Sequence, residues 1–465
     1  PEQAAVNASR RMVQRYGLLG PDEIRQKSRK DPNIFPPVVL WNYTRSLEPP
    51  TIEEGFRTVE RVPFVRAWGP EYTNRALLLA ALAKGTSHLR GALKSDDTRH
   101  MSNALRQMGV TIDEPDDTSF VVTSTGDLQI PEGPLFLGNA GTAVRFLTAA
   151  VCTVNGSVTL DGDHYMQKRP IGPLLESLRK GGLSAESATG CPPVVIHGSG
   201  AIKATRFEID GGLSSQYVSA LLMVAACGAA PIEVALTGKE IGARGYIDLT
   251  IACMRAFGAE VEVVDDALWR VSPTGYTACD YQIEPDASAA TYLWAAEALT
   301  AGKIDLGVAA EAFTQPDAKA MEMIAQFPRM QAVINGSQMQ DAMPTLAVLA
   351  AFNETPVRFV DLANLRVKEC DRVQALHDGL NQVRPGLATV EGDDLLVAAD
   401  PGLAGTSSTG LINTHSDHRI AMCFALAGLK VSGVRIQDPE CVAKTYPGYW
   451  RALEFLGVKL EHGQV

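Results

Sequence analysis

The feature of this sequence that most constrains its fold is a sixfold repeat of one helix and strand pattern. Each repeat has a polar or glycine-rich helix start, an Ala/Leu-rich helix, a break at a small residue, a β-rich run and usually a second helix. The first helices are expected to start at Thr73, Gly141, Ser215, Asp286, Asp341 and Ser416, roughly 70 residues apart with one interval nearer 55. Thr73 is the expected N-cap of its helix, and Gly85 is the expected stop signal.

A repeat of this size is too small to bury two helices and its strands alone, so the repeats must pack together. The first helices are apolar nearly all round, which places them inside. Six repeats then suggest an α/β fold with two domains of three units each, with inner helices and outer sheets. The alternative is a generic α/β chain, in which any alternation of helices and strands looks periodic.

The composition excludes several classes of function. The chain has 465 residues, 46% hydrophobic and 20% charged, which suffices for two domains with cores of their own. A net charge of -11 argues against a nucleic-acid partner. No apolar run reaches the roughly 18 residues of a membrane span, and the N-terminus lacks a signal-peptide core, so we expect a cytoplasmic protein with no membrane partner. The scattered cysteines predict neither a zinc site nor a disulfide framework.

Cations recur at the helix starts in spite of the acidic total. Each alone would be interpreted as a surface charge or an internal ion pair, but together they indicate a cleft that binds a small polyanion. Helix N-termini add partial positive charge, and Gly138, Gly141, Ser214 and Ser215 supply backbone or hydroxyl donors. The cations are Arg75, Arg145, Arg169, Lys368, Arg372, Arg419 and Lys444.

Two carboxylates lie among these cations in the sequence. Asp341 opens a helix after "GSQMQ", and Glu369 directly follows Lys368. As structural elements they would be a helix N-cap and an ion-pair partner. As functional elements they would be the acid and the base of a proton transfer on a phosphorylated substrate.

The sequence resembles a known family, the 5-enolpyruvylshikimate-3-phosphate synthases. The resemblance runs from about residue 57 to 460 and rests, in order, on "LFLGNAGTAVRFLTAA", "MQKRPIGPLLESLR", "SSQYVSALLM", "DASAATY", "NLRVKECDRV", "SDHRIAMCF" and "CVAKTYPGYW". It implies an enolpyruvyl transferase fold, an inside-out α/β barrel arrangement with three βαβαββ units in each of two domains. Two crossings, near Arg66 to Gly69 and near Glu284, would join the domains.

The resemblance also implies domain boundaries. Residues 57–67 plus 285–465 would form a discontinuous domain 1, residues 68–284 would form domain 2, and the substrate cleft would lie between them. Residues 1–56 lie outside the repeats and are interpreted as an N-terminal extension and connector.

The family reaction transfers the enolpyruvyl group of phosphoenolpyruvate to the 5-hydroxyl of shikimate 3-phosphate. By resemblance, Asp341 would accept the hydroxyl proton, and Glu369 would handle the proton at the methylene carbon. The residues implied for shikimate 3-phosphate are Arg75, Ser214, Ser215, Gln216, Tyr246, Asp341, Asn364 and Lys368. Those implied for phosphoenolpyruvate are Gly141, Arg169, Gln216, Arg372, His418, Arg419 and Lys444. No metal or other cofactor is expected, and the chain is expected to act as a monomer.

The UDP-N-acetylglucosamine enolpyruvyl transferases share this fold and are the nearest alternative. Many of them carry a reactive cysteine in the mobile loop before the arginine of the third helix. The matching loop here, "DGDHYMQKRPIG", has no cysteine, and "RVKECDR" also favours the shikimate branch.

The stretch "RAWGPEYTNR" departs from the family, which has P-G-S-K-S-x-x-N-R before the first helix. Alignment on Asn74 and Arg75 sets Pro70 against a lysine that touches both substrates, and Glu71 against the second serine. Loss of one partner of a desolvated charged hydrogen bond costs about 2 to 5 kcal/mol. A like charge at about 4 Å costs on the order of 4 kcal/mol at an effective dielectric near 20.

Milder departures from the family sequence are Ala243, Pro285, Ala289 and Phe146.

Three hypotheses about the function follow. The chain is a working synthase whose other cations compensate, or a non-catalytic relative that binds shikimate 3-phosphate or a similar metabolite, or a synthase altered deliberately at residues 66–71.

Overall fold

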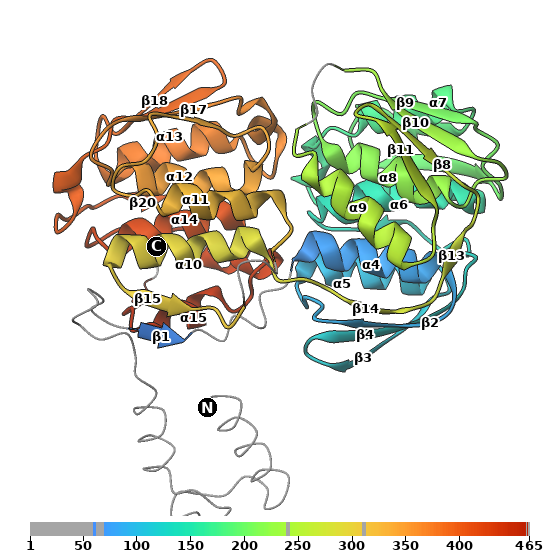
Figure 1. The fold of residues 1–465 in the computed structure, drawn as a ribbon, viewed down its shortest axis with the longest axis horizontal. Coiled ribbons are helices and arrows are strands. Elements are labelled where there is room, and N and C mark those ends of the chain that lie inside the picture. Colours follow the sequence, from blue (N-terminus) through green and yellow to red (C-terminus); the bar gives the residue numbers. More distant parts are fainter. Residues whose placement is uncertain (1–58, 62–68, 239–241, 309–312, 462, 464–465) are drawn as a thin grey trace, which may run out of the picture. The chain divides into compact units, whose positions relative to one another are not determined.

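The computed structural model describes residues 59–61, 69–238, 242–308, 313–461 and 463 (Figure 1). The expected N-terminal extension of residues 1–56 and the crossing near Arg66 lie outside this part of the chain. Contacts group Arg61–Thr300 and Ile304–Val465 into one compact unit. The other unit holds most of the described residues of β1 (Val59–Arg61) and the first residue of β15 (Lys303–Asp305).

The expected helices are present in all six repeats. The first helices are α4 (Pro70–Leu82), α6 (Gly141–Ala150), α8 (Ser215–Ala225), α10 (Ala287–Thr300), α12 (Met343–Ala350) and α14 (His418–Gly428). The second helices are α5 (Asp96–Gln107), α7 (Gly172–Lys180), α9 (Gly245–Ala256), α11 (Ala320–Ile324), α13 (Arg372–Val383) and α15 (Tyr449–Phe455). Short 3-10 turns that carry site residues are η6 (Pro316–Lys319), η7 (Gln340–Ala342), η8 (Ala363–Val367) and η10 (Pro439–Lys444).

Three four-stranded sheets share one topology, in which the first two strands pair in parallel and the last two join as an antiparallel hairpin. Their orders are β5-β6-β8-β7, β11-β12-β10-β9 and β16-β17-β19-β18. The strands are β5 (Leu135–Phe136), β6 (Asn155–Asp161), β7 (Ser184–Ser187), β8 (Val194–Ser199), β9 (Arg206–Ile209), β10 (Ile232–Leu236), β11 (Val261–Asp265), β12 (Leu268–Val271), β16 (Val333–Asn335), β17 (Val357–Val360), β18 (Ala388–Glu391) and β19 (Asp394–Val397). With their helices, these sheets give the βαβαββ order and confirm the expected fold class.

Of the other described sheets, one pairs β1 with β15, and two are variants of this unit. A five-stranded sheet is formed by β2 (Ala83–Arg90), β3 (Thr111–Asp116), β4 (Ser119–Thr125), β13 (Tyr276–Thr277) and β14 (Asp280–Gln282). A two-stranded parallel sheet is formed by β20 (Leu411–Ile412) and β21 (Arg435–Ile436). The sheets stay separate, and none of those described closes into a barrel.

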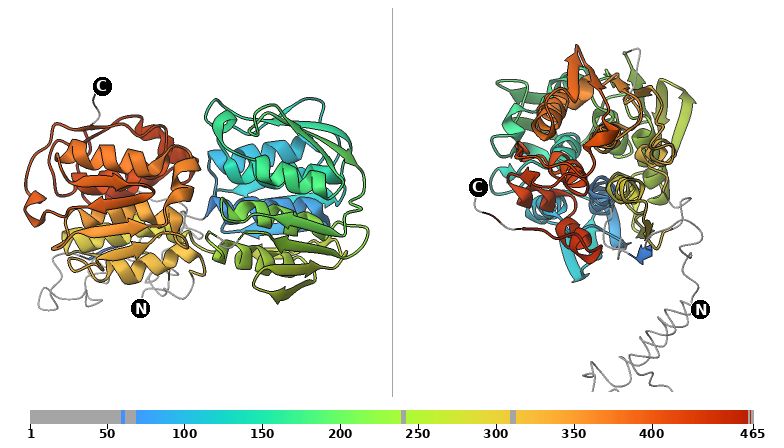
Figure 2. Two further views of the ribbon diagram at one scale, coloured as in Figure 1. Left: turned by 90° about the horizontal axis from the view of Figure 1, so that it is seen from above. Right: turned by 90° about the vertical axis from the view of Figure 1, so that its left-hand side faces the viewer.

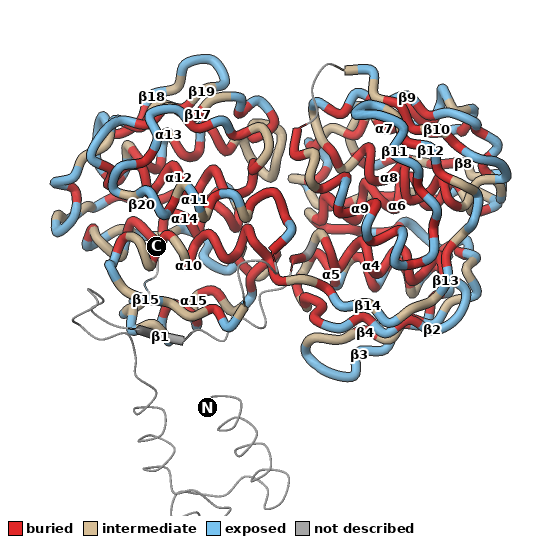
Figure 3. Tube along the Cα trace, in the orientation of Figure 1, coloured by how far each residue is buried: buried red, intermediate tan, exposed pale blue. Residues whose placement is uncertain are grey.

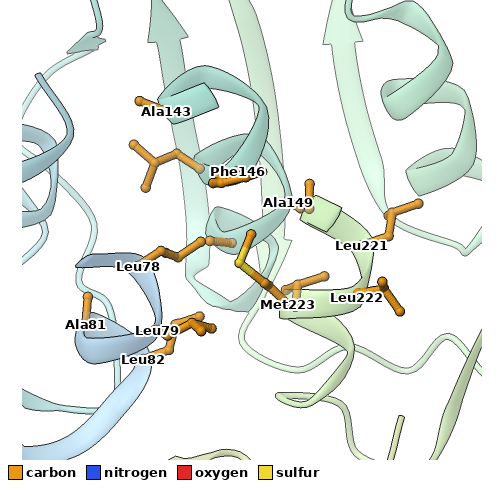
Figure 4. Close-up of a cluster of buried hydrophobic side chains, with 14 of the residues drawn as sticks. Leu78, Leu79, Ala81, Leu82, Ala143, Phe146, Ala149, Leu221, Leu222 and Met223 are labelled. Carbon is orange, nitrogen blue, oxygen red and sulfur yellow. The ribbon is translucent and has the colours of Figure 1, made fainter. Parts of the chain in front are cut away.

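The first helices form the interior and the sheets lie outside them (Figures 1 and 2). Every residue of α6, α8 and α12 except Gln216 is buried, whereas the strands alternate buried and exposed residues (Figure 3). Buried apolar residues form two clusters, one spanning Tyr72–Ile283 and the other Ala287–Leu453. In Figure 4, side chains of α4, α6 and α8 gather around one centre, with Leu78 close to Met223. Such helices are apolar all round because every face meets another element.

Two expected signals of the first helix, its N-cap and its stop, are wrong. Helix α4 begins at Pro70 with Gly69 as N-cap, rather than at an N-cap of Thr73. Proline is well placed at the first helical position, because the N–H it lacks has no partner there. The Thr73 hydroxyl donates to the Gly69 carbonyl oxygen at 3.0 Å and accepts from the Leu93 amide at 3.0 Å. Gly85 does not stop the helix, which ends at Leu82, but lies inside β2 with φ +119°.

Other helix starts differ by a few residues. Asp341 is not an N-cap, since it lies within η7 before α12. Asp417, rather than Ser416, caps α14, and its carboxylate accepts from the Arg419 amide at 2.9 Å. Ser214 caps α8 through the Gln216 amide at 3.3 Å. The chain therefore brings its site residues to the first turns of helices by caps that local sequence identifies only in part.

Candidate active site

A polar pocket lies at the starts of several first and second helices and at the end of η10. Its lining residues come from both parts of the chain, the part that forms the first hydrophobic cluster and the part that forms the second. They are Glu71, Asp97, Gly141, Thr142, Arg169, Gln216, Asp341, Lys368, Glu369, Arg372, His418, Arg419, Lys444 and Thr445. This set includes ten of the residues expected from the sequence.

The Asp341 carboxylate is surrounded by three cations. Its oxygens lie 2.9 Å from Nη1 of Arg372, 3.0 Å from Nη2 of Arg419 and 3.6 Å from Nζ of Lys368. Burial raises the pKa of Asp341, but the positive charges outweigh burial and hold the pKa well below its usual range. Asp341 is therefore ionised, and the three cations suppress its basicity.

The Glu369 carboxylate has a similar environment. It lies 2.6 Å from Nζ of Lys444, 2.5 Å from Nη2 of Arg372 and 3.6 Å from Nη1 of Arg169. Burial raises the pKa of Glu369, but Lys444, Arg372 and Arg169 hold it well below its usual range. Burial lowers the pKa of Lys444, but Asp97 and Glu369 raise it above its usual value, and its Nζ donates a hydrogen bond to Glu369.

Arg372 connects the two carboxylates. Besides Asp341 and Glu369, it donates through Nε to Asp417 at 2.8 Å, and Asp417 is fully buried. Burial lowers the pKa of Arg372, but the three carboxylates raise it above its usual value. Because its guanidinium is held on three sides, Arg372 is a fixed rather than a mobile cation.

Gly141 and Arg169 form the other side of the pocket. A Cβ atom on Gly141 would lie 2.6 Å from Nη2 of Arg169, so only glycine leaves room for this guanidinium. Nη1 of Arg169 donates to the carbonyl and side-chain oxygens of Asn139 at 3.1 and 3.0 Å, while its buried Nε has no partner. The helix start and the guanidinium thus present donors to the same space.

Gln216 is oriented by neighbouring side chains. Its Oε1 accepts from Nη1 of the buried Arg145 at 2.5 Å, and its Nε2 donates to Oγ1 of Thr142 at 3.3 Å. Arg145 does not line the pocket, although the sequence grouped it with the other cations. Its role in the structure is to hold the Gln216 amide.

His418 lines the pocket with a neutral ring. Burial lowers the pKa of His418, and Lys444 and Arg419 lower it further, well below its usual range. Both ring nitrogens are buried without a hydrogen-bond partner. Unpaired buried nitrogens beside a pocket are suited to contact a bound molecule.

Several expected site residues do not line this pocket. The Arg75 side chain is fully buried, donates to Oγ1 of Thr250 and to the Glu71 carbonyl oxygen, and lies over the Phe146 ring at 4.9 Å. The Tyr246 hydroxyl donates to Asp317 at 2.7 Å. Ser214, Ser215 and Asn364 also lie outside the lining. Arg75 Nη2 and Asn364 Oδ1 are buried without a partner, so these two residues keep unused hydrogen-bonding capacity.

Other lining residues were not predicted as site residues. Asp97 lies 3.4 Å from Nζ of Lys444, and burial raises its pKa to about 6. Asp97 is one of two adjacent acids that follow Ser95, and this pattern predicts only a residue in the first turn of a helix. Its place in the pocket therefore depends on tertiary packing. Thr142 and Thr445 carry no signal of their own. Glu71, recognised only as a departure from the family motif, also lines the pocket.

The lining charges nearly cancel. Five cations, Arg169, Lys368, Arg372, Arg419 and Lys444, face four carboxylates, Glu71, Asp97, Asp341 and Glu369. Among the residues that the structure describes, no group of three His, Cys, Asp or Glu could hold a metal ion. Within the same residues, no helix has the length and apolar character of a membrane span.

Comparison with known proteins gives consistent matches over this part of the chain. The sequence pattern of the EPSP synthase (3-phosphoshikimate 1-carboxyvinyltransferase) family matches residues 64–453. A 3-phosphoshikimate 1-carboxyvinyltransferase of Pseudomonas syringae pv. syringae (strain B728a) is 69% identical over 389 residues, 84% of this chain and 93% of the relative. One of Rhizobium leguminosarum bv. trifolii (strain WSM2304) is 66% identical over 386 residues, 83% of this chain and 92% of the relative.

A solved structure of EPSP synthase from Acinetobacter baumannii has a TM-score of 0.66 and 25% sequence identity. The match covers 86% of this chain and 95% of that chain.

Proposed function

This chain belongs to the EPSP synthase (3-phosphoshikimate 1-carboxyvinyltransferase) family, and we propose that it transfers the enolpyruvyl group of phosphoenolpyruvate to the 5-hydroxyl of shikimate 3-phosphate. The products are 5-enolpyruvylshikimate 3-phosphate and phosphate. The observation that carries the proposal is the pocket itself, in which five cations surround two buried, ionised carboxylates, Asp341 and Glu369. This arrangement combines the binding of two anions with two positions for proton transfer.

We propose one set of residues for each substrate. Arg75, Ser214, Ser215, Gln216, Tyr246, Asp341, Asn364 and Lys368 would bind shikimate 3-phosphate. Gly141, Arg169, Gln216, Arg372, His418, Arg419 and Lys444 would bind phosphoenolpyruvate. The second set is supported more directly, since all seven of its members line the pocket. In the first set, Gln216, Asp341 and Lys368 do so.

The first chemical step is an addition. Asp341 accepts the proton of the 5-hydroxyl of shikimate 3-phosphate, and the oxygen of that hydroxyl forms a bond to C2 of phosphoenolpyruvate. The methylene carbon C3 takes a proton from the Glu369 side and becomes a methyl group. The carboxylates become competent when substrate anions compete for Lys368 and Lys444, because losing these neighbours raises the pKa of each carboxyl.

The second step is an elimination. The bond from C2 to the phosphate oxygen breaks, the methyl carbon returns a proton to the Glu369 side, and phosphate leaves with the electron pair. Arg169, Arg372 and Arg419 stabilise negative charge on the leaving phosphate, as preorganised cations do in phosphate chemistry.

We also propose the organisation that the sequence predicted. Residues 57–67 plus 285–465 form domain 1, residues 68–284 form domain 2, and the substrate cleft lies between them. The two separate hydrophobic clusters support this division. The chain works in the cytoplasm as a monomer on small molecules, and its net charge of -11 supports the absence of a nucleic-acid partner.

The direct test is phosphate release from shikimate 3-phosphate plus phosphoenolpyruvate, with formation of the enolpyruvyl product followed by NMR. We expect phosphate and product in equal amounts, and no phosphate when either substrate is omitted. Tight binding of shikimate 3-phosphate in calorimetry with no turnover would contradict the proposal and favour a non-catalytic binding protein.

Gly141→Ala is expected to raise KM for phosphoenolpyruvate by roughly tenfold to a hundredfold, the equivalent of losing one hydrogen bond to a charged group. The added Cβ would lie 2.6 Å from Arg169 Nη2, so this side chain must move away from Asn139. Steady-state kinetics with phosphoenolpyruvate varied would measure the change. Gly133→Ala is the matched control, since no atom lies within 4 Å of its Cβ position. An unchanged KM in Gly141→Ala would remove Arg169 from the proposed binding set.

A further inference from the structure

Asp317 is a buried carboxylate that does not line the pocket but contacts segments from both hydrophobic clusters. Its side chain in η6 is fully buried. One oxygen accepts hydrogen bonds from the Tyr246 hydroxyl at 2.7 Å and the Ser288 hydroxyl at 3.0 Å. The other oxygen accepts from the Ala342 amide at 3.0 Å. One carboxylate thus connects α9, α10 and η7.

One of these partners, Tyr246, belongs to the proposed site, and another, Ala342, is next to a site residue in the chain. Ala342 directly follows Asp341 in η7, so the bond to its amide fixes the turn that carries Asp341. Tyr246 is the second residue of α9, and a Cβ on the preceding Gly245 would lie 2.6 Å from Cγ of Pro316. This close approach leaves η6 and α9 little freedom to shift. Any change in the Asp317 side chain is therefore transmitted to both partners.

The surroundings of Asp317 disfavour its charged form in spite of its hydrogen bonds. Burial and the nearby charge of Asp341 raise its pKa to about 6, while Tyr246, Arg419 and Ser288 act in the opposite direction. Asp286 is a further buried carboxylate that interacts with it. A neutral side chain could accept the same amide hydrogen bond without this penalty. An ionised Asp317 does, however, oppose the three cations that suppress the basicity of Asp341.

We propose that Asp317 is a positioning residue, which fixes the Asp341 turn and the Tyr246 hydroxyl on one carboxylate and whose negative charge keeps Asp341 a better proton acceptor. This inference rests on the proposed function, because it acts on the proton transfer to Asp341. Asp317 itself touches no substrate.

The kinetic test compares the wild-type chain with Asp317→Asn, which keeps the shape and removes the charge. We expect kcat to fall roughly tenfold, because a weaker base transfers the proton less readily, while KM for phosphoenolpyruvate stays unchanged. We also expect a difference between the two pH profiles of kcat. In the wild type, kcat falls as the pH drops through about 6 and Asp317 takes up a proton, and in Asp317→Asn this step is absent.

Ser288→Ala is the control. It removes one hydrogen bond to Asp317 but leaves the charge. We expect kcat within about twofold of the wild type at alkaline pH, where Asp317 is ionised in both, and the fall in kcat shifted to higher pH, because the ionised form has lost a donor. If Asp317→Asn keeps the wild-type kcat and the wild-type pH profile, the inference is overturned, even if the variant is less stable.

A second readout does not depend on turnover. The folded-state pKa of Asp317 lies above its unfolded value of 3.8, so ionisation destabilises the fold. The wild type should therefore lose free energy of unfolding relative to Asp317→Asn as the pH rises from about 4 to 6. Urea unfolding at several pH values measures this difference. A wild type without turnover would contradict the proposed function, and this measurement alone would then test the inference. A difference in free energy of unfolding between the two proteins that does not change with pH would overturn it.

Discussion

Replacing Pro70 with lysine and Glu71 with serine is expected to raise kcat/KM by at least about thirtyfold, the lower limit for a restored desolvated charged hydrogen bond of about 2 kcal/mol. Glu71 lines the pocket, and the lining already holds three other carboxylates against five cations. Two substrate anions add further negative charge there. Removing Glu71 and adding a lysine makes the pocket more positive by two charges.

The change is compatible with the local fold. Pro70 is the first residue of α4 and Glu71 the second. Lysine and serine are both tolerated in a first helical turn, although Glu71 gives up a favourable interaction with the helix dipole worth about 0.3 to 1 kcal/mol. Any loss of stability should therefore be small beside the expected gain in rate.

Phosphate release by the parent, both single variants and the double variant measures the effect. Asp96→Ser is the matched control, because Asp96 is a half-buried first-turn acid of α5 outside the pocket, and it should leave kcat/KM unchanged. A parent that already turns over as fast as the double variant would show that the other cations have replaced the lysine. In that case the alignment of Pro70 with the family lysine, or the energy assigned to it, is wrong.

Asp341→Asn is expected to lower kcat by about 10² to 10⁴, the contribution of a positioned general base. The amide keeps the size of the carboxyl but accepts no proton from the 5-hydroxyl. It also removes the charge that Arg372, Arg419 and Lys368 share. Single-turnover kinetics, which isolate the chemical step, would measure the loss.

Two further variants show whether this loss is specific. Asp394→Asn is the control, since Asp394 pairs with Arg358 at 2.8 Å outside the pocket, and its kcat should match the wild type. Glu369→Gln should instead suppress the exchange of solvent deuterium into the methylene group, since Glu369 is proposed to handle that proton. If urea unfolding shows that Asp341→Asn is folded, and this variant retains the wild-type kcat, Asp341 is not the base.

The repeat pattern predicted the fold well, because its signal is strong and local. Helices that are apolar all round must be interior, and this alone places α6, α8 and α12. Helix boundaries were predicted less well at "RAWGPEYTNR". Thr73 resembles an N-cap in sequence, but its hydroxyl bonds back to Gly69, and Pro70 already occupies the first helical position.

The site was predicted by a different route. The sequence grouped the cations of the pocket at helix starts, which holds for Arg372 and Arg419, whereas Lys368 follows η8 and Lys444 ends η10. The family resemblance assigned them roles. Asp97 and Asp317 were missed, because a buried carboxylate in the first turn of α5 or in η6 has the same local sequence as an exposed one. Arg75 and Tyr246 were predicted in the site, and their hydrogen bonds with Thr250 and Asp317 could not be foreseen.

The sequence by itself determined the repeat, the interior helices, the family and most of the charged residues of the pocket, because periodicity and motif spacing are properties of neighbouring residues. Only the tertiary structure decided which charges meet. Asp341, Glu369 and Arg372 become one network because helix starts distant in sequence are packed together. Their pKa values follow from distance and burial, which depend on the packing of the whole chain.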